Sequence, residues 1–430
     1  MKTLPMIIIF ATAAMTLGNV WADQNEAGDS AAAAPIYDPD PSHLWNRLHH
    51  VFFARPDVDL DSDVVDPPLW PDTSGFLKTG ARHETAITVL DEFLTKDGHA
   101  LIADSLKKAV LQHDLWAVFD WSASSRSAEP NADLRSRLAL AIRRLALSPE
   151  EIAALPDNLA NSAAAGVFAN DFDLENPKEP FLPTDLLDPE GSWICVRGAI
   201  DGPIAPVHTQ YYQGRSPFLV FIQVPGGRAP TLKYLAELNQ ATQQVKVRDS
   251  KDLPQFPVGT KTALLRQMTA IDDAGQIQVT PLTQTLQMRI YRQVGTGLTD
   301  HENIQAAVKF RMKRSSLFAE GHGGLVPIGL SEPLRVSLLQ TADVYDRETE
   351  GTGIKTTMQS CIACHSCGGG GTIHSIFTYK QDEWVPGGHQ MAPSELRLMA
   401  TNAAQESKDT VNWKKSRYEW GLLVGLLEER

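Results

Sequence analysis

Two cysteines and a histidine lie close together at Cys361, Cys364 and His365, in the spacing C-x-x-C-H. On a helical turn, residues three and four positions apart share one face, so both thiols and the imidazole can point to one side. Two thiols placed in this way can form thioethers with the two vinyl groups of one porphyrin, while the imidazole binds its iron. The motif therefore predicts covalent attachment of one haem, with His365 as the proximal iron ligand.

These five residues resemble the haem-attachment site of the c-type cytochromes. A looser likeness follows at Met391, which lies 26 residues after His365 and two before Pro393. A methionine shortly before a proline in the loop after the haem motif is similar to the distal methionine segment of small cytochromes c. The resemblance implies haem c as the cofactor and Met391 as the sixth iron ligand, a thioether that favours electron transfer.

Other residues could occupy the sixth position of the iron. His374, His389 and Met399 lie in the same part of the chain, and Met358 lies too close before Cys361 to reach the opposite haem face. An open or water-ligated iron would instead permit ligand binding or peroxide chemistry. The choice decides between electron transfer and catalysis, so the sequence leaves open whether the protein is an enzyme.

The cysteines could also form a zinc site or a redox dithiol. A zinc site would need further ligands, because Cys361, Cys364, Cys367 and His365 lie too close together for an easy tetrahedral cage. A redox dithiol of the thioredoxin type normally lies beside a βαβ pattern, and the sequence shows none. Covalent haem is the reading that the spacing favours.

The first 22 residues have the pattern of a secretory signal peptide. Lys2 gives the positive start, Met6–Leu17 is a short apolar run, and Val20-Trp21-Ala22 places a small residue before the expected cleavage at Asp23. The apolar run is too short for a comfortable membrane span, and no later run is long enough, so no transmembrane segment is expected after cleavage. Export together with haem c indicates the periplasm of a Gram-negative bacterium.

Export also bears on the remaining cysteines, because free thiols rarely persist in an oxidising compartment. The chain has four cysteines, and haem attachment would leave Cys195 and Cys367. They either form a disulfide, or one or both are buried and reduced.

The composition is that of a globular protein, and its charge excludes one class of partner. Of 430 residues, 43% are hydrophobic and 21% are charged, and the net charge is -13. A nucleic-acid-binding protein normally carries a basic surface, so no nucleic-acid partner is expected. The expected partner is a redox protein.

The sequence before residue 191 predicts a helical region. Residues 23–41 are rich in Ala, Asp and Pro and look like a flexible leader. A helical domain is expected over 42–155, where Leu134, Leu138 and Ile142 form an apolar stripe and Ser148-Pro149-Glu150-Glu151 has the pattern of a helix start. The Asp-, Asn- and Pro-rich stretch 156–190 is expected to be a linker.

The period of the pattern changes after residue 190. Alternation of apolar and polar residues around Leu286 and Phe310, with a turn at Asp272–Gly275, predicts a mostly antiparallel β domain over 191–330, for which a sandwich is the suggested architecture. One helix is expected at Thr231–Asn239. The basic cluster Lys309, Arg311, Lys313 and Arg314 is expected to be one solvated strand face or, second, a dock for an acidic partner.

Residues 331–430 return to a helical pattern. The haem helix should end at Gly368–Gly371, a helix is expected at Pro393–Ala404, and Trp413, Trp420, Leu423 and Leu427 follow helical spacing. The resemblance implies a small helical cytochrome c-like module here. The predicted fold class is therefore α+β, with a helical N-terminal region, a mostly antiparallel β middle domain and the haem module at the C-terminus.

The function predicted from the sequence is an exported c-type cytochrome-domain protein that binds one haem and transfers electrons in the periplasm. One alternative is a haem enzyme or ligand sensor with an open sixth iron position. The other is an exported binding or scaffold protein in which the haem is structural.

Overall fold

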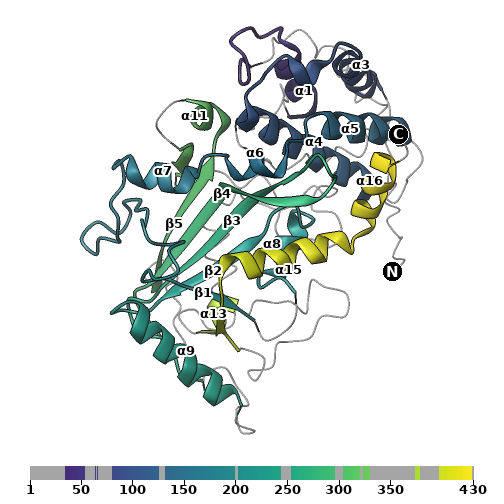
Figure 1. Cartoon of the computed structure of the whole chain (residues 1–430). Coiled ribbons are helices and arrows are strands. Elements are labelled where there is room, and N and C mark those ends of the chain that lie inside the picture. The colour runs from purple at the N-terminus through teal and green to yellow at the C-terminus, as the bar shows by residue number, and fades with distance from the viewer. Residues whose placement is uncertain are drawn as a thin grey trace, which may run out of the picture.

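The computed structural model describes residues 34–53, 63, 65, 80–124, 131–198, 202–243, 253–295, 304–319, 323–329, 373–377 and 397–428. Figure 1 shows a twisted antiparallel sheet with most helices gathered around one end of it. The fold is α+β, as the sequence predicts. The predicted signal peptide, the haem motif and Met391 lie outside the described residues.

The sheet has seven strands in the order β6-β5-β4-β3-β2-β1-β7, and every pairing is antiparallel. The strands are β1 (Ile194–Arg197), β2 (Phe218–Gln223), β3 (Lys261–Ile271), β4 (Ile277–Tyr291), β5 (Gln305–Met312), β6 (Leu325–Pro327) and β7 (Met399–Ala400). The predicted turn closes the β3–β4 hairpin, where Gly275 has a φ of 75° that favours glycine. The described part of the chain forms this single sheet rather than the suggested sandwich.

The helices fall into three groups along the chain. Before the sheet come α1 (Leu44–Phe53), α3 (Ala81–Thr95), α4 (Ser105–Ser124), α5 (Ala132–Arg144), α6 (Pro149–Ala153) and α7 (Asn158–Ala164). Between and after its central strands lie α8 (Pro206–Tyr211), α9 (Arg228–Thr242) and α11 (Arg314–Phe318). The C-terminal helices are α13 (His374–Phe377), α15 (Ala403–Lys415) and α16 (Tyr418–Glu428).

Local sequence patterns predict several of these elements correctly. The stripe of α5 is buried at Leu134, Leu138 and Ile142. At the start of α6, the Ser148 hydroxyl accepts from the Glu151 N–H, and the Glu151 carboxylate accepts from the Ser148 N–H. These reciprocal bonds satisfy two helix N–H groups that would otherwise lack partners.

One hydrophobic core joins the helices before the sheet to the sheet and to the C-terminus. Alternation along the strands directs side chains such as Leu265, Leu286 and Phe310 to one sheet face, where they share a core with α4 and α5 and with Leu423 of α16. We call this the helix-covered face. The predicted linker contributes to the same core, because Phe181 and Leu182 are buried within it.

The opposite face carries a second, smaller cluster. Ile194 of β1 and Ile222 of β2 pack with Tyr234 and Leu238 of α9. In Figure 1, α9 lies at the end of the sheet away from α3 and α5. We call this side the α9 face.

Two expectations about the ends of the chain are wrong. Tyr37 lies in the predicted flexible leader, yet its side chain is buried in the core and its hydroxyl donates to Asp114 Oδ2 at 3.2 Å. The helix predicted at Pro393–Ala404 is replaced, in its described part, by the short strand β7, and α15 starts at Ala403. The chain is extended there because Met399 and Ala400 pair with β1 and form the edge strand of the sheet.

Arg314 also differs from its prediction as part of a solvated face. Its side chain is fully buried, and its Nε donates to Asp114 Oδ2 at 3.1 Å. Burial, with the Asp114 carboxylate second, raises the pKa of the Tyr37 hydroxyl well above its usual value, so that group stays a neutral donor. Asp114, Arg314 and Tyr37 therefore form a buried charge cluster in which the carboxylate has both a cation and a neutral donor.

Removing the cation of this cluster should destabilise the protein strongly. Arg314→Gln leaves Asp114 buried without its counter-ion, which typically costs about 3–5 kcal/mol in the free energy of unfolding. The matched control is Arg137→Gln, which breaks the partly exposed pair with Asp91 and should cost less than about 1 kcal/mol. Urea unfolding of both variants measures the difference, and equal losses would contradict this account.

Candidate functional site

The predicted haem residues lie outside the described part of the chain, but two segments that follow them in the sequence are described. Cys361, Cys364, His365 and Met391 all fall in undescribed stretches. The described segment 373–377 follows the haem motif, and 397–400 follows Met391. Where these two segments are attached limits where the haem motif and Met391 can lie.

The segment after the haem motif is attached to the α9 face. The Ile373 N–H donates to Gln255 Oε1 at 2.9 Å, and Arg289 Nη1 donates to the Ser375 carbonyl at 3.2 Å. The Ser375 hydroxyl donates to the Tyr291 hydroxyl at 3.1 Å. Ile373 is buried in the hydrophobic cluster of this face.

The segment after Met391 enters the same cluster. Leu398 is buried there, and its N–H and carbonyl are both bonded to the Asn239 side chain on α9, at 3.1 and 2.8 Å. Eight residues separate His365 from Ile373, and seven separate Met391 from Leu398. At about 3.5 Å per residue, these intervals span at most about 28 and 25 Å. The described segments that follow the two predicted iron ligands therefore both pack on the α9 face, which we take as the candidate site.

Of the alternative sixth ligands, only Met399 has a described side chain. It lies in β7, is paired with Arg197 across the strand, and is 39% exposed. His374 begins α13, but its side chain is outside the described part, and so is all of His389.

Cations gather on the α9 face of the three central strands. Arg266 on β3, Arg289 on β4, and Lys309 and Arg311 on β5 share this face, because paired residues of adjacent strands point to the same side. We call these four residues the cationic patch. Arg266 and Arg289 are buried, whereas Lys309 and Arg311 are half-buried, so the expected solvated strand face is only partly exposed.

Helix α8 and the residues after it border the patch. The Arg266 guanidinium stacks 3.8 Å from the centre of the Tyr212 ring, and the His208 ring lies 5.4 Å from that of Phe218. Burial lowers the pKa of His208 to about 4, and the charges of Lys309 and Arg289 act in the same direction. His208 is therefore neutral at neutral pH, and it adds no further positive charge to the patch.

This combination of groups suits an amphipathic anion. The side chains of Tyr291 and Phe256, whose ring centres are 4.4 Å apart, belong to a buried hydrophobic cluster beside the cations. Among the described residues, no group of three or more His, Cys, Asp or Glu side chains could hold a metal ion. The cations would suit the anionic propionates of a haem, the cofactor that the sequence predicts.

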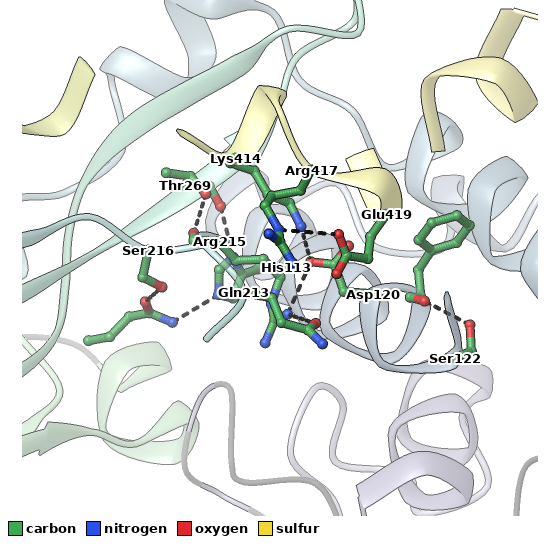
Figure 2. Close-up of polar contacts among 12 residues, drawn as sticks. His113, Asp120, Ser122, Gln213, Arg215, Ser216, Thr269, Lys414, Arg417 and Glu419 are labelled. Carbon is green, nitrogen blue, oxygen red and sulfur yellow. Dashed lines mark hydrogen bonds and ion pairs between the residues drawn. The ribbon is translucent and has the colours of Figure 1, made fainter. Parts of the chain in front are cut away.

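A second polar cluster lies on the helix-covered face (Figure 2). Asp120 of α4 is buried between two cations: Arg215 Nη1 donates to its Oδ2 at 3.1 Å, and Lys414 Nζ of α15 donates to the same oxygen. Burial lowers the pKa of Lys414, while Asp120 opposes that shift. This cluster fixes α15 to α4.

A neutral hydrogen-bonded chain runs beside it (Figure 2). His113 Nδ1 donates to the Thr269 carbonyl at 2.9 Å, so its Nε2 accepts from Gln284 Nε2 at 3.0 Å. Gln284 Oε1 in turn accepts from the Ser216 hydroxyl at 2.6 Å. The carbonyl can only accept, which fixes the histidine tautomer. The contacts join the helices to β3 and β4, so we assign the cluster to stability.

The sequence shows Asp114 and Asp120 as acids that interrupt an apolar segment, but it gives no indication of their partners. Those partners are 77 to 294 residues away in the chain. The only local sign was that two acids in an otherwise apolar helix must be compensated if the helix is buried.

Comparisons with protein-family models, with curated proteins and with solved structures found no match for this chain. In the part of the chain that the structure describes, no helix has the length and apolar character needed to cross a bilayer.

Cys195 is a buried, free thiol on β1. Burial raises its pKa to about 12, with a smaller contribution from Glu406. This state matches the buried and reduced alternative for Cys195, while Cys367 lies outside the described residues.

The thiol of Cys195 should therefore be unreactive in the folded protein, because the thiolate is the nucleophile and is not formed at neutral pH. Iodoacetamide at pH 8, followed by peptide mass analysis, should label Cys195 only after unfolding in urea. Labelling that also requires a reductant would instead indicate a disulfide with Cys367. Rapid labelling of the folded protein would contradict the burial.

Glu406 of α15 provides a pH test of how the C-terminal helix packs on the sheet. Its side chain is buried, and burial, helped by Asp409 and opposed by Arg197, raises its pKa to about 7. The folded state then holds this proton more tightly than the unfolded state does, so stability should fall as the pH rises from about 4.5 to 7.

Glu406→Gln should remove this part of the loss in the free energy of unfolding, which is about 1–2 kcal/mol after allowance for solvent screening. The measurement is urea unfolding at several pH values. Glu237→Gln, at an exposed position on α9, is the control and should behave as the unmodified protein does. If the stability of Glu406→Gln depends on pH as that of the unmodified protein does, Glu406 ionises as readily in the folded state as in the unfolded state, which would contradict the raised pKa.

Proposed function

We propose that this chain is an exported c-type cytochrome-domain protein that binds one haem covalently and transfers electrons in the bacterial periplasm. Cys361 and Cys364 would form the thioethers, and His365 would bind the iron. The observation that carries the proposal is the C-x-x-C-H spacing, in a chain that begins with the pattern of a secretory signal peptide.

The surroundings support the proposal. The described segments that follow the haem motif and Met391 both enter one hydrophobic cluster, on the α9 face. When bound, the haem would supply a one-electron ferric/ferrous couple. His365 and Met391 would hold the iron, and the positive charges of the α9 face would favour an anionic cofactor. The electron would pass to or from a partner redox protein.

Cys361 and Cys364 should be necessary for haem attachment, and Cys195 should not be. The protein, expressed with haem-attachment machinery, should show a haem-stained band on a denaturing gel, because thioether bonds survive denaturation. Cys361→Ala/Cys364→Ala should abolish the stained band, while Cys195→Ala should retain it. An unstained band for the unmodified, exported protein would contradict the proposal.

Spectra of the same protein test electron transfer against ligand chemistry. Two axial protein ligands predict a six-coordinate, reversibly reducible haem that does not readily bind small iron ligands. Met391→Ala should lower the reduction potential and open the sixth position, because a thioether ligand favours the ferrous state. A five-coordinate haem in the unmodified protein would favour the enzyme or sensor alternative instead.

A further inference from the structure

Two cations on the α9 face have no carboxylate partner among the described residues. In the described part of the chain, no Asp or Glu lies within ion-pair distance of Arg289 or Lys309, although most other buried cations described there, such as Arg314 and Lys414, are paired with carboxylates. Arg289 is only 6% exposed, and its guanidinium donates to neutral oxygens, namely the Ser375 carbonyl at 3.2 Å and the Tyr291 hydroxyl at 3.1 Å.

The two charges are also close to each other. Arg289 pairs with Ala307, and Lys309 lies two residues further along β5, so Arg289 and Lys309 are diagonal neighbours on the same face. Diagonal positions of this kind are about 7–8 Å apart. Both lie near the His208 ring, and each disfavours its protonation. Like charges at this spacing repel, and the neutral imidazole does not offset them.

A buried positive charge without a counter-ion is costly, so proteins normally compensate it. The oxygens of Ser375 and Tyr291 solvate the guanidinium but do not neutralise it. An anionic group placed between Arg289 and Lys309 would satisfy both cations at once. A carboxylate suits this geometry, because Arg289 can donate two parallel N–H bonds to it and Lys309 can act as a point charge.

We propose that Arg289 and Lys309, with His208 beside them, form a carboxylate-binding site for a haem propionate. This inference rests on the proposed function and makes it specific. Ser375, which is bonded to Arg289, lies ten residues after His365, so the cation and the haem motif are linked by a short stretch of chain. The carboxylate of a haem propionate would supply the anion that these two cations lack among the described residues.

Loss of either charge should make the haem harder to reduce, because a nearby cation stabilises the added electron. Arg289→Gln and Lys309→Gln should each lower the equilibrium constant for haem reduction about three- to tenfold, which corresponds to about 30–60 mV for one electron. Arg289→Lys keeps the charge and should restore most of the loss. Lys261→Gln is the control, because Lys261 lies on β3 at the opposite face of the sheet, paired with Asp171.

The measurement is spectroelectrochemical titration of the haem-bearing protein, with thermal unfolding to confirm that each variant is folded. Lower potentials in both variants, rescue by Arg289→Lys and no change in Lys261→Gln would support the site. Covalent haem with unchanged potentials in Arg289→Gln/Lys309→Gln would overturn the site and leave the proposed function standing.

Absence of covalent haem would overturn both. A thermal shift then tests whether a free anion is the ligand. Stabilisation of the haem-free Cys361→Ala/Cys364→Ala protein by succinate, lost on adding Arg289→Gln, would mean that the two cations bind a free carboxylate and would contradict the propionate assignment.

Discussion

Two buried carboxylates on helix α4 bind side chains from distant parts of the chain and so hold those parts together. Asp114 and Asp120 lie on α4, where no water can solvate them, so each must be neutralised within the protein. Asp114 receives Tyr37 from the start of the described chain and Arg314 from the end of β5. Asp120 receives Arg215 from before β2 and Lys414 from α15. The partners come from four distant parts of the sequence, and all four meet at α4. This explains why the C-terminal helices share the core of the sheet.

Charged side chains on the two faces of the sheet have different kinds of partner. On the helix-covered face, Asp114 and Asp120 are bonded to cations inside the core. On the α9 face, the bonds of Arg289 within the described residues go to neutral oxygens, and no carboxylate described there pairs with Arg289 or Lys309. The first arrangement holds the fold together, whereas the second leaves positive charge uncompensated among the described residues. The described segments after the haem motif and after Met391 pack on this same side.

Features encoded within a few residues could be predicted from the sequence, and features that depend on distant partners could not. The capping box at Ser148, the hairpin turn at Gly275 and the stripe of α5 are local patterns, and all three are confirmed. The burial of Tyr37 and Arg314 was missed because their common partner, Asp114, is 77 and 200 residues away. A basic cluster such as Lys309–Arg314 normally indicates solvent, and only the strand register separates its residues into different environments. The haem site is a prediction from residue type and spacing, and its residues lie outside the described part of the chain.

The most direct test of the account is the intact mass of the exported protein, measured under denaturing conditions. The account predicts the mass of residues 23–430 plus one haem, unchanged by denaturation because two thioether bonds hold the group to Cys361 and Cys364. The mass of the polypeptide alone, from cells that attach haem to other exported proteins, would contradict it.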